Sequence, residues 1–255
     1  MKRWLVFGLV VGLAGALAGA VSQAPKVLAQ VDAFRIDSIQ LRGNLFLSPA
    51  EATRTVAVSP TASVWDDLDP LEERLRAHPL VADAKVRRRF PATLVLEVTE
   101  ETPVALVSNP TLEPVDATGR FLPIDPAEHP LDLPIITITE PREEGGLSAA
   151  ERRLVAGELA RMAQADPDFL SRISEVALDP RGDLWAQLWR RDDGGEIGDF
   201  PITFSFRPNL PRGRVQEGIK VLGDAMTRFE EAVVVGLDLR YEDQVVVRIR
   251  RAEGN

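Results

Sequence analysis

The sequence predicts an α+β protein made of a membrane segment, a small domain of order β-α-α-β-β, and a larger mixed β-sheet domain with two main helices. Three observations lead to this prediction. Residues 4–21 form an apolar run without a charged residue. Residues 34–100 combine alternating strand patterns with two short helix-start signals. Residues 101–251 contain several short apolar strands and two longer segments with helical periodicity.

The composition is that of a globular chain and excludes several kinds of chemistry. The chain has 255 residues, of which 45% are hydrophobic and 27% charged. Its formal net charge of −9 argues against binding to nucleic-acid phosphates. It has no cysteine, and its two histidines, His78 and His129, each precede a proline. We therefore expect no catalytic, metal or cofactor site, no nucleic-acid partner and no small-molecule substrate.

The apolar run of residues 4–21 is predicted to be a transmembrane helix. At ~1.5 Å per residue it would span about 27 Å, close to the thickness of the hydrocarbon core. Lys2 and Arg3 precede it, so the positive-inside rule places residues 1–3 in the cytoplasm as a short tail. Residues 25–255 would then lie outside the membrane, with residues 22–33 as a linker.

A cleaved signal peptide is the alternative interpretation of this segment. The small residues at Ala18-Gly19-Ala20 or Val27-Leu28-Ala29 are compatible with cleavage. The apolar run is longer than a typical signal core, which favours a retained anchor. Both interpretations export the rest of the chain.

The domain at residues 34–100 begins with a half-buried strand over residues 34–42, whose alternation slips at Asp37-Ser38. Gly43-Asn44 predicts a tight turn with left-handed backbone. Ser48 predicts a capped helix with Pro49 at its first position, and Asp69 predicts a second helix of the same design.

Two further strands and a basic triplet complete this domain. Before Phe90-Pro91, Val81, Ala84 and Val86 are expected on one face of a strand, with Lys85 and Arg87 on the other. After it, Leu94, Leu96 and Val98 alternate with Thr93, Val95 and Glu97. Arg87, Arg88 and Arg89 are interpreted as a solvated strand end, with Arg88 pairing with a nearby carboxylate. A patch that binds lipid or a partner is the alternative.

The larger domain is predicted to contain a capped helix starting at Ser148 and a second helix over residues 212–229. The apolar stripe of this second helix favours packing on a core over a coiled-coil seam. Trp185 and Trp189 would fit a glycan-stacking surface, although packing on a strand is the simpler interpretation. The last strand, residues 245–250, is apolar and expected to lie at a sheet edge.

Several of these motifs together resemble one family. The run from Pro79 to Glu100, written P-L-V-x-x-A-x-V-x-R-x-F-P-x-T-L-x-L-x-V-x-E, resembles the POTRA domain of the FtsQ/DivIB family of bacterial cell-division proteins. Pro103-Val104-Ala105, the turn around Gly119, and Asp238-Leu239-Arg240-Tyr241 are also similar to that family. POTRA domains of outer-membrane assembly and secretion proteins usually occur in tandem before a β-barrel, and here we find one copy.

The resemblance implies a non-enzymatic, single-pass membrane scaffold of the divisome, enriched at the division septum. It implies an FtsQ-like β domain over residues 101–251, a tail of residues 252–255, and docking of FtsB/FtsL-like proteins and other divisome components. We expect the last strand to accept a partner strand by β-augmentation. The expected partner-binding residues are Arg240, Tyr241, Val245, Val246, Val247, Arg248 and Ile249. Arg87, Arg88 and Arg89 are the candidate recruitment surface of the POTRA domain.

Two other functions fit the residues less well. An exported enzyme or glycan-binding module would need convergent polar groups in residues 104–250, and no catalytic motif occurs there. A transport accessory protein built on a POTRA domain is the other alternative. A polar cleft would favour the first, and septal localisation would count against both.

Overall fold

The chain divides into two compact units, with the boundary between Glu101 and Thr102. The computed structural model describes residues 28–109, 111–138, 146–165, 171–188, 201–228 and 232–251. Residues 28–101 are called the N-terminal unit below, and the described residues from 102 to 251 the C-terminal unit. Within the described residues, no helix has the length and hydropathy needed to cross a membrane. The expected span, residues 4–21, lies outside them.

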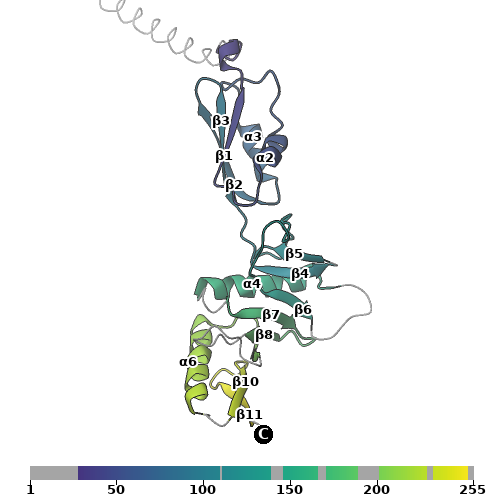
Figure 1. Ribbon diagram of the computed structural model, residues 1–255, viewed down its shortest axis with the longest axis vertical. Helices are drawn as coiled ribbons and strands as arrows, with labels where there is room; N and C mark the ends of the chain where they lie inside the picture. Colours follow the sequence, from purple (N-terminus) through teal and green to yellow (C-terminus); the bar gives the residue numbers. More distant parts are fainter. Residues whose placement is uncertain are drawn as a thin grey trace, which may run out of the picture. The chain divides into compact units, whose positions relative to one another are not determined.

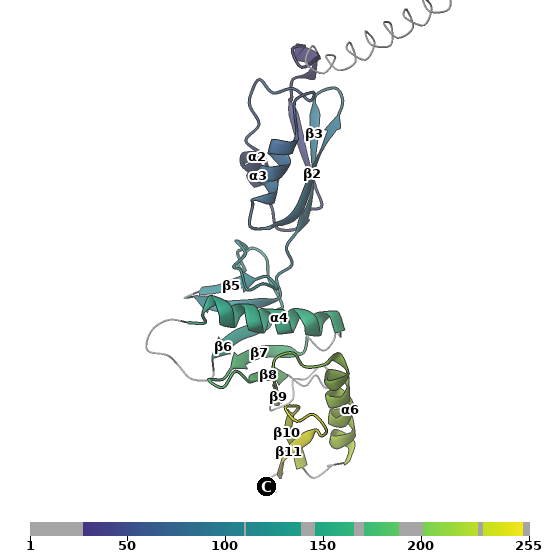
Figure 2. The ribbon, with the colours of Figure 1, turned by 180° about the vertical axis from the view of Figure 1, so that it is seen from behind.

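The N-terminal unit packs two short helices on a three-stranded sheet (Figure 1). Its strands are ordered β1-β3-β2, with β1 parallel and β2 antiparallel to β3. Both helices lie on the same side of the sheet, as the reverse view also shows (Figure 2). The elements are η1 (Asp32–Phe34), β1 (Ser38–Arg42), α2 (Pro49–Val56), α3 (Asp69–Arg76), β2 (Val81–Arg89) and β3 (Thr93–Glu100). The predicted β-α-α-β-β order is therefore confirmed.

Local chemistry explains where these elements begin. The Ser48 hydroxyl accepts a hydrogen bond from the backbone N–H of Glu51, and Pro49 occupies the first turn of α2, as predicted. Gly43 has a φ of 81°, and a Cβ there would lie 2.2 Å from the carbonyl oxygen of Val98. The turn after β1 therefore requires glycine both for its backbone angle and for its contact with β3.

Two predictions for this unit were wrong in detail. α3 has Leu68 as its N-cap, with no side-chain capping bond, so Asp69 does not repeat the Ser48 cap. Instead, Asp69 donates its own N–H to the Asp67 carboxylate. β1 begins at Ser38, four residues later than predicted, and Asp32–Phe34 form a 3-10 turn before it. The slip of the pattern at Asp37-Ser38 thus marks the start of the strand.

We expect Ser48→Ala to lower the stability of the N-terminal unit by about 1 kcal/mol, because it removes the only side-chain cap on α2. Asp69→Ala is the matched control, since Asp69 starts a helix of equal length without capping it. It should cost less than about 0.5 kcal/mol, from the helix dipole alone. Urea denaturation of the two variants measures this difference, and equal costs would contradict the assignment of the caps.

The C-terminal unit is an eight-stranded sheet with two long helices. The strand order is β11-β10-β9-β8-β7-β6-β4-β5. β10 pairs antiparallel with β11 and parallel with β9. The strands are β4 (Ala105–Asn109), β5 (Thr111–Val115), β6 (Ile135–Ile138), β7 (Ile173–Leu178), β8 (Leu184–Leu188), β9 (Ile202–Phe206), β10 (Ala232–Asp238) and β11 (Val246–Arg251); the helices are α4 (Ala149–Ala165) and α6 (Arg212–Arg228).

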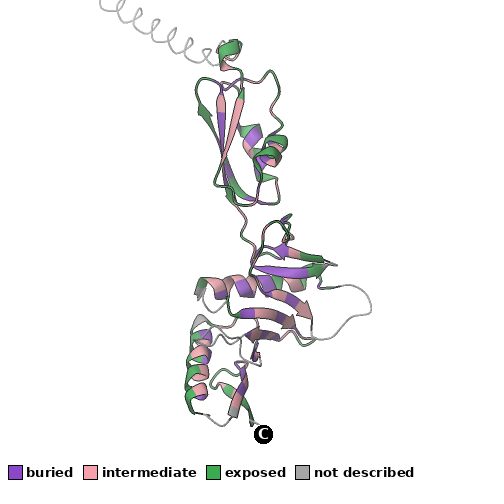
Figure 3. Cartoon of the chain, viewed as in Figure 1, coloured by how far each residue is buried: buried purple, intermediate pink, exposed green. Residues whose placement is uncertain are grey.

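The core of this unit lies between the helices and one face of the sheet. Figure 3 shows buried residues alternating with partly buried ones along the central strands. On α6, Val215 is buried and Ile219, Leu222 and Met226 pack against the same core. The apolar stripe of this helix therefore faces the core, as predicted, and the Ser148 cap of α4 is also confirmed by the hydrogen bond that its hydroxyl accepts from Glu151.

The residues expected to bind a partner lie only partly within the last two strands. β10 ends at Asp238, so Arg240 and Tyr241 follow the strand instead of extending it. β11 begins at Val246, so Val245 precedes the strand and packs against the core, partly buried. The tail of residues 252–255 and Trp189 lie outside the described residues.

Candidate interaction edge

β11 lies at one edge of the eight-stranded sheet, and β10 is its neighbour on the inner side. Within the described ranges, no strand pairs with the outer side of β11. An edge of this kind presents backbone N–H and C=O groups to any extended chain that approaches it. The edge position predicted for the last strand is therefore confirmed.

The side chains of β11 divide between the two faces of the sheet. Val247 pairs with buried Leu237 and packs against the core, and Ile249 follows on that face with 47% of its surface exposed. Val246 pairs with Asp238 and Arg248 with Gly236, on the opposite face. The edge therefore combines an apolar border on one face with arginine on the other.

The opposite edge of the same sheet is protected. β5 contains Pro114, which has no backbone N–H and which pairs with Leu106 of β4. Proline is a common means of blocking strand addition at an edge. β11 contains neither proline nor an acidic residue. Of the two edges, β11 is thus the one suited to accept another strand.

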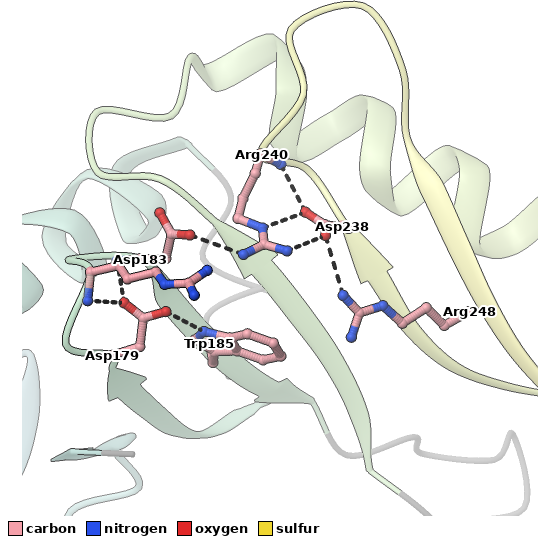
Figure 4. A network of polar contacts seen from close by, with 7 residues as sticks. Asp179, Asp183, Trp185, Asp238, Arg240 and Arg248 are labelled. Carbon is pink, nitrogen blue, oxygen red and sulfur yellow. Dashed lines mark hydrogen bonds and ion pairs between the residues drawn. The ribbon is translucent and has the colours of Figure 1, made fainter. Parts of the chain in front are cut away.

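Arg240 is held by two carboxylates next to this edge (Figure 4). Its guanidinium donates to Asp238 at 2.8 Å and 2.6 Å through Nε and Nη2, and to Asp183 at 2.9 Å through Nη1. The Asp238 side chain is only 4% exposed and also accepts from Arg248 at 3.3 Å. Hydrogen bonds from Arg240 lower the pKa of Asp238 against the opposing effect of burial, and the same pair raises the pKa of Arg240.

Trp185 links this ion-pair network to β8. The guanidinium carbons of Arg240 and Arg248 lie 5.6 Å and 5.7 Å from the centre of its ring, within cation–π range. Its indole N–H points to the carboxylate of Asp179 (Figure 4). The surrounding hollow of about 280 Å³ is lined by Ala177, Trp185, Gln187, Thr203, Val235, Gly236 and Arg248. Trp185 thus contacts side chains of the protein itself, on the face of the sheet that carries Arg248.

Tyr241 is the exposed aromatic residue of the turn between β10 and β11, with 48% of its surface accessible. Arg214, in the first turn of α6, donates to the carbonyl oxygens of Tyr241 at 2.7 Å and of Gln244 at 2.9 Å. Arg214 is itself only 13% exposed. The turn that presents Tyr241 is thus fixed by a residue from another element.

The three arginines of β2 do not form one patch. Arg87 pairs with Glu97 at 2.6 Å, and Arg89 donates to Gln40 at 3.1 Å. Arg88 projects to the helix side of the sheet, where it donates to the main-chain carbonyl groups of Val64 and Asp66. The predicted carboxylate partner of Arg88 was therefore wrong.

Within the described residues, no cluster of three or more His, Cys, Asp or Glu side chains has a geometry that could hold a metal ion. The concentration of charge around Asp238 is instead an ion-pair network with hydrogen bonds to both carboxylate oxygens. This arrangement links Asp238, at the end of β10, to Arg240 and to Arg248 of β11.

The comparisons with known proteins agree with the fold. The model of the FtsQ-type POTRA domain matches residues 34–101. A cell division protein FtsQ from Anaeromyxobacter sp. is 32% identical over 233 residues, which cover 88% of this chain and 74% of that protein. The chain belongs to the FtsQ family of cell division proteins.

Other members of the FtsQ family match over different lengths. The FtsQ protein of Myxococcus fulvus is 32% identical over 151 residues, or 57% of this chain and 53% of that protein. The FtsQ protein of Novosphingobium aromaticivorans is 26% identical over 239 residues, or 90% of this chain and 66% of that protein. The N-terminal unit is thus an FtsQ-type POTRA domain, and the similarity extends into the C-terminal unit.

For this FtsQ-family chain, Arg214 is a residue that sequence reasoning missed. We expect Arg214→Ala to lower the backbone NMR order parameters of residues 241–244 from about 0.85 to below about 0.6, because the two charge-assisted hydrogen bonds that Arg214 donates to carbonyl oxygens of the turn are lost. Arg207→Ala, at an exposed position directly after β9, is the matched control and should leave the order parameters unchanged. Equal order parameters in both variants would show that Arg214 does not order the turn.

Proposed function

We propose that this chain is a non-enzymatic, single-pass membrane scaffold of the divisome that links early and late division proteins. It binds an FtsB/FtsL-like partner by adding a strand of that partner to β11. The observation that carries the proposal is an unblocked edge strand beside an ordered, exposed tyrosine. Strand addition uses main-chain hydrogen bonds for affinity and alternate side chains for specificity.

The side chains of β11 indicate the chemistry of the partner strand. Three of its six residues, Arg248, Arg250 and Arg251, are basic. Like charges placed opposite each other destabilise a strand pair, so a second copy of β11 is a poor partner. A strand with carboxylates opposite Arg248 and Arg250 and apolar residues opposite Val247 and Ile249 complements both faces.

Tyr241 and Arg240 have different roles in this proposal. Tyr241 is exposed and provides an aromatic anchor, a residue type enriched in binding hot spots. The guanidinium of Arg240 is already paired with Asp238 and Asp183, so Arg240 stabilises the strands behind the edge. The partner surface thus comprises Tyr241, Val246, Arg248 and Ile249, with Val245 and Val247 packing beneath it.

The apolar run and the charges before it support the proposed topology. Residues 4–21 anchor the chain in the cell membrane, residues 1–3 lie in the cytoplasm, and residues 25–255 lie outside. The POTRA domain, residues 34–100, recruits the chain to the division site, and the exposed arginines Arg87 and Arg89 are part of its candidate surface. The FtsQ-like domain, residues 101–251, then holds the partner at the septum.

Localisation of the full chain tests this function. A fusion to a fluorescent protein that folds outside the cytoplasm should concentrate at the septum of dividing cells. A fusion carrying Ile249→Lys should still reach the septum but fail to retain the FtsB-like partner there. Uniform membrane fluorescence of the unmodified fusion would contradict the proposed function.

A further inference from the structure

The N-terminal unit has two chemically different ends. The chain enters at η1, beside the start of β1, and leaves at the far end of β3. β3 has eight residues, so its ends are roughly 23 Å apart at ~3.3 Å per residue. The turn between β2 and β3, at Phe90-Pro91, lies at the same end as η1, because Asp37 donates its N–H to the carbonyl oxygen of Ala92.

An aromatic cluster occupies the end where the chain enters. Phe34 and Trp65 meet edge to face with their ring centres 5.8 Å apart, and Trp65 and Phe90 are 4.9 Å apart. Phe90 leaves 53% of its surface exposed, and nearby in the chain Val31 leaves 44% exposed. These four residues, Val31, Phe34, Trp65 and Phe90, are called the aromatic rim.

The exposed part of Phe90 is not needed to complete the core of the unit. The core of this unit is closed below it by fully buried Val64 and Leu94. The indole N–H of Trp65 is buried within the rim and makes no hydrogen bond. The rings of Phe34, Trp65 and Phe90 contact one another, so the exposed part of Phe90 belongs to an apolar cluster. Exposed apolar surface of this kind, which the fold does not use, marks a contact with something outside the domain.

The position of the rim in the chain indicates what it contacts. Residues 22–30 separate it from the apolar run of residues 4–21, and they span at most ~30 Å at ~3.3 Å per residue. If residues 4–21 cross the bilayer, the rim is always within reach of the membrane surface. Tryptophan is favoured at the headgroup level of bilayers, and phenylalanine and aliphatic side chains insert at the boundary between headgroups and acyl chains.

Charge around the rim is mixed. Arg35 and Arg89 are exposed at this end, and so are Asp32, Asp66 and Asp67. The contact therefore does not depend on anionic lipid, and apolar insertion provides the attraction. A weak contact of this kind is sufficient, because a short tether gives the rim a high effective concentration at the membrane surface.

We propose that the aromatic rim docks into the headgroup region of the bilayer, with Phe90 and Val31 reaching the boundary of the acyl chains. This inference rests on the topology in the proposed function. It makes the POTRA domain lie against the membrane by its N-terminal end, while the opposite end, which carries exposed Leu45, stays in water. The contact limits which surfaces of the POTRA domain are available for recruitment.

The absence of cysteine allows a direct test with the full chain in phosphatidylcholine vesicles. A single cysteine labelled with an environment-sensitive fluorophore is placed by Val31→Cys, by Phe90→Cys or, as a matched control, by Leu45→Cys. Leu45 is apolar and 73% exposed, but it follows β1 at the other end of the unit. Nitroxide lipids labelled near the headgroup should quench the Val31 and Phe90 probes at least about threefold more than the Leu45 probe.

A second substitution separates docking from mere proximity of the tether. In the Val31→Cys protein, adding Phe90→Glu should reduce quenching to the level of the Leu45 probe, whereas adding Leu45→Glu should not. Equal quenching with and without Phe90→Glu would overturn the proposal. A probe at Val10→Cys, near the middle of residues 4–21, reports on the anchor itself when the nitroxide is carried on the acyl chains. Strong quenching there with none at Phe90 overturns only the docking, and no quenching at either position overturns the proposed topology as well.

Discussion

Replacing Ile249 with lysine is expected to weaken binding of the proposed FtsB/FtsL-like partner by about 30-fold or more, equivalent to roughly 2 kcal/mol. Ile249 is 47% exposed on β11, on the apolar border that the partner strand would cover. Lysine removes that apolar contact and adds a charge to a strand that already has three arginines. The dissociation constant of residues 28–255 for the partner's extracytoplasmic region measures the effect.

The other edge of the sheet provides the matched control. Leu112 is 40% exposed on β5, the edge strand that contains Pro114. Leu112→Lys makes the same change of side chain at a comparable exposure and should leave affinity within about twofold, as surface substitutions away from an interface usually do. Equal loss of affinity in both variants would indicate a general effect of charge and not strand addition at β11.

Replacing Arg240 with alanine should lower the free energy of unfolding of the C-terminal unit by about 3 kcal/mol. The loss arises because the buried Asp238 carboxylate loses its two shortest hydrogen bonds and keeps only the longer one from Arg248 among its side-chain partners. Arg248→Ala is the matched control. Arg248 is 46% exposed and lies 3.3 Å from the same carboxylate, so its removal should cost less than about 1 kcal/mol. Urea denaturation of residues 28–255 measures both values.

The pH dependence of unfolding gives a second measurement of the same pair. The pKa of Asp238 is lowered in the folded protein, so its contribution is present above the ordinary value of 3.8 and is lost as the pH falls below it. The unmodified protein should therefore lose stability as the pH falls through this range, and Arg240→Ala should lose less. An unchanged slope in Arg240→Ala would show that Arg240 does not control the ionisation of Asp238.

Much of the POTRA domain is predictable because its signals are local. Ser48 and Glu51 are three residues apart, and the positive φ of Gly43 is set by the turn itself. The alternation predicts the buried positions Ala84 and Val86 of β2 and Leu94, Leu96 and Val98 of β3, although Val95 is buried on the other face. The prediction that Asp69 caps α3 was wrong, because a cap-forming residue followed by proline does not reveal whether its side chain caps the helix or lies one position inside it.

The candidate edge was only partly predictable. The apolar pattern and the final position in the chain indicate an edge strand, and the sheet order confirms it. The role of Arg240 could not be derived, because its partner Asp183 is 57 residues away and the two meet only after β8 and β10 join the same sheet. The contact of Arg214 with the carbonyl group of Tyr241 could not be predicted either, because a main-chain acceptor is not specified by any residue type.

Recognising that the β5 edge is protected and the β11 edge is not requires both the sequence and the strand order of the sheet. Pro114 is visible in the sequence, but its meaning depends on β5 being the outermost strand, which only the sheet order establishes. With that order known, one proline and three arginines give the two edges different properties. β5 resists any added strand, and β11 resists its own copy while remaining open to an acidic strand.

Amide hydrogen exchange of residues 28–255, measured with and without the FtsB/FtsL-like partner, tests strand addition most directly. Added main-chain hydrogen bonds should slow exchange at alternate amides within Val246–Arg251, and exchange within Thr111–Val115 should not change. Partner binding that leaves exchange in Val246–Arg251 unchanged, or that protects Thr111–Val115 instead, would contradict β11 as the binding edge.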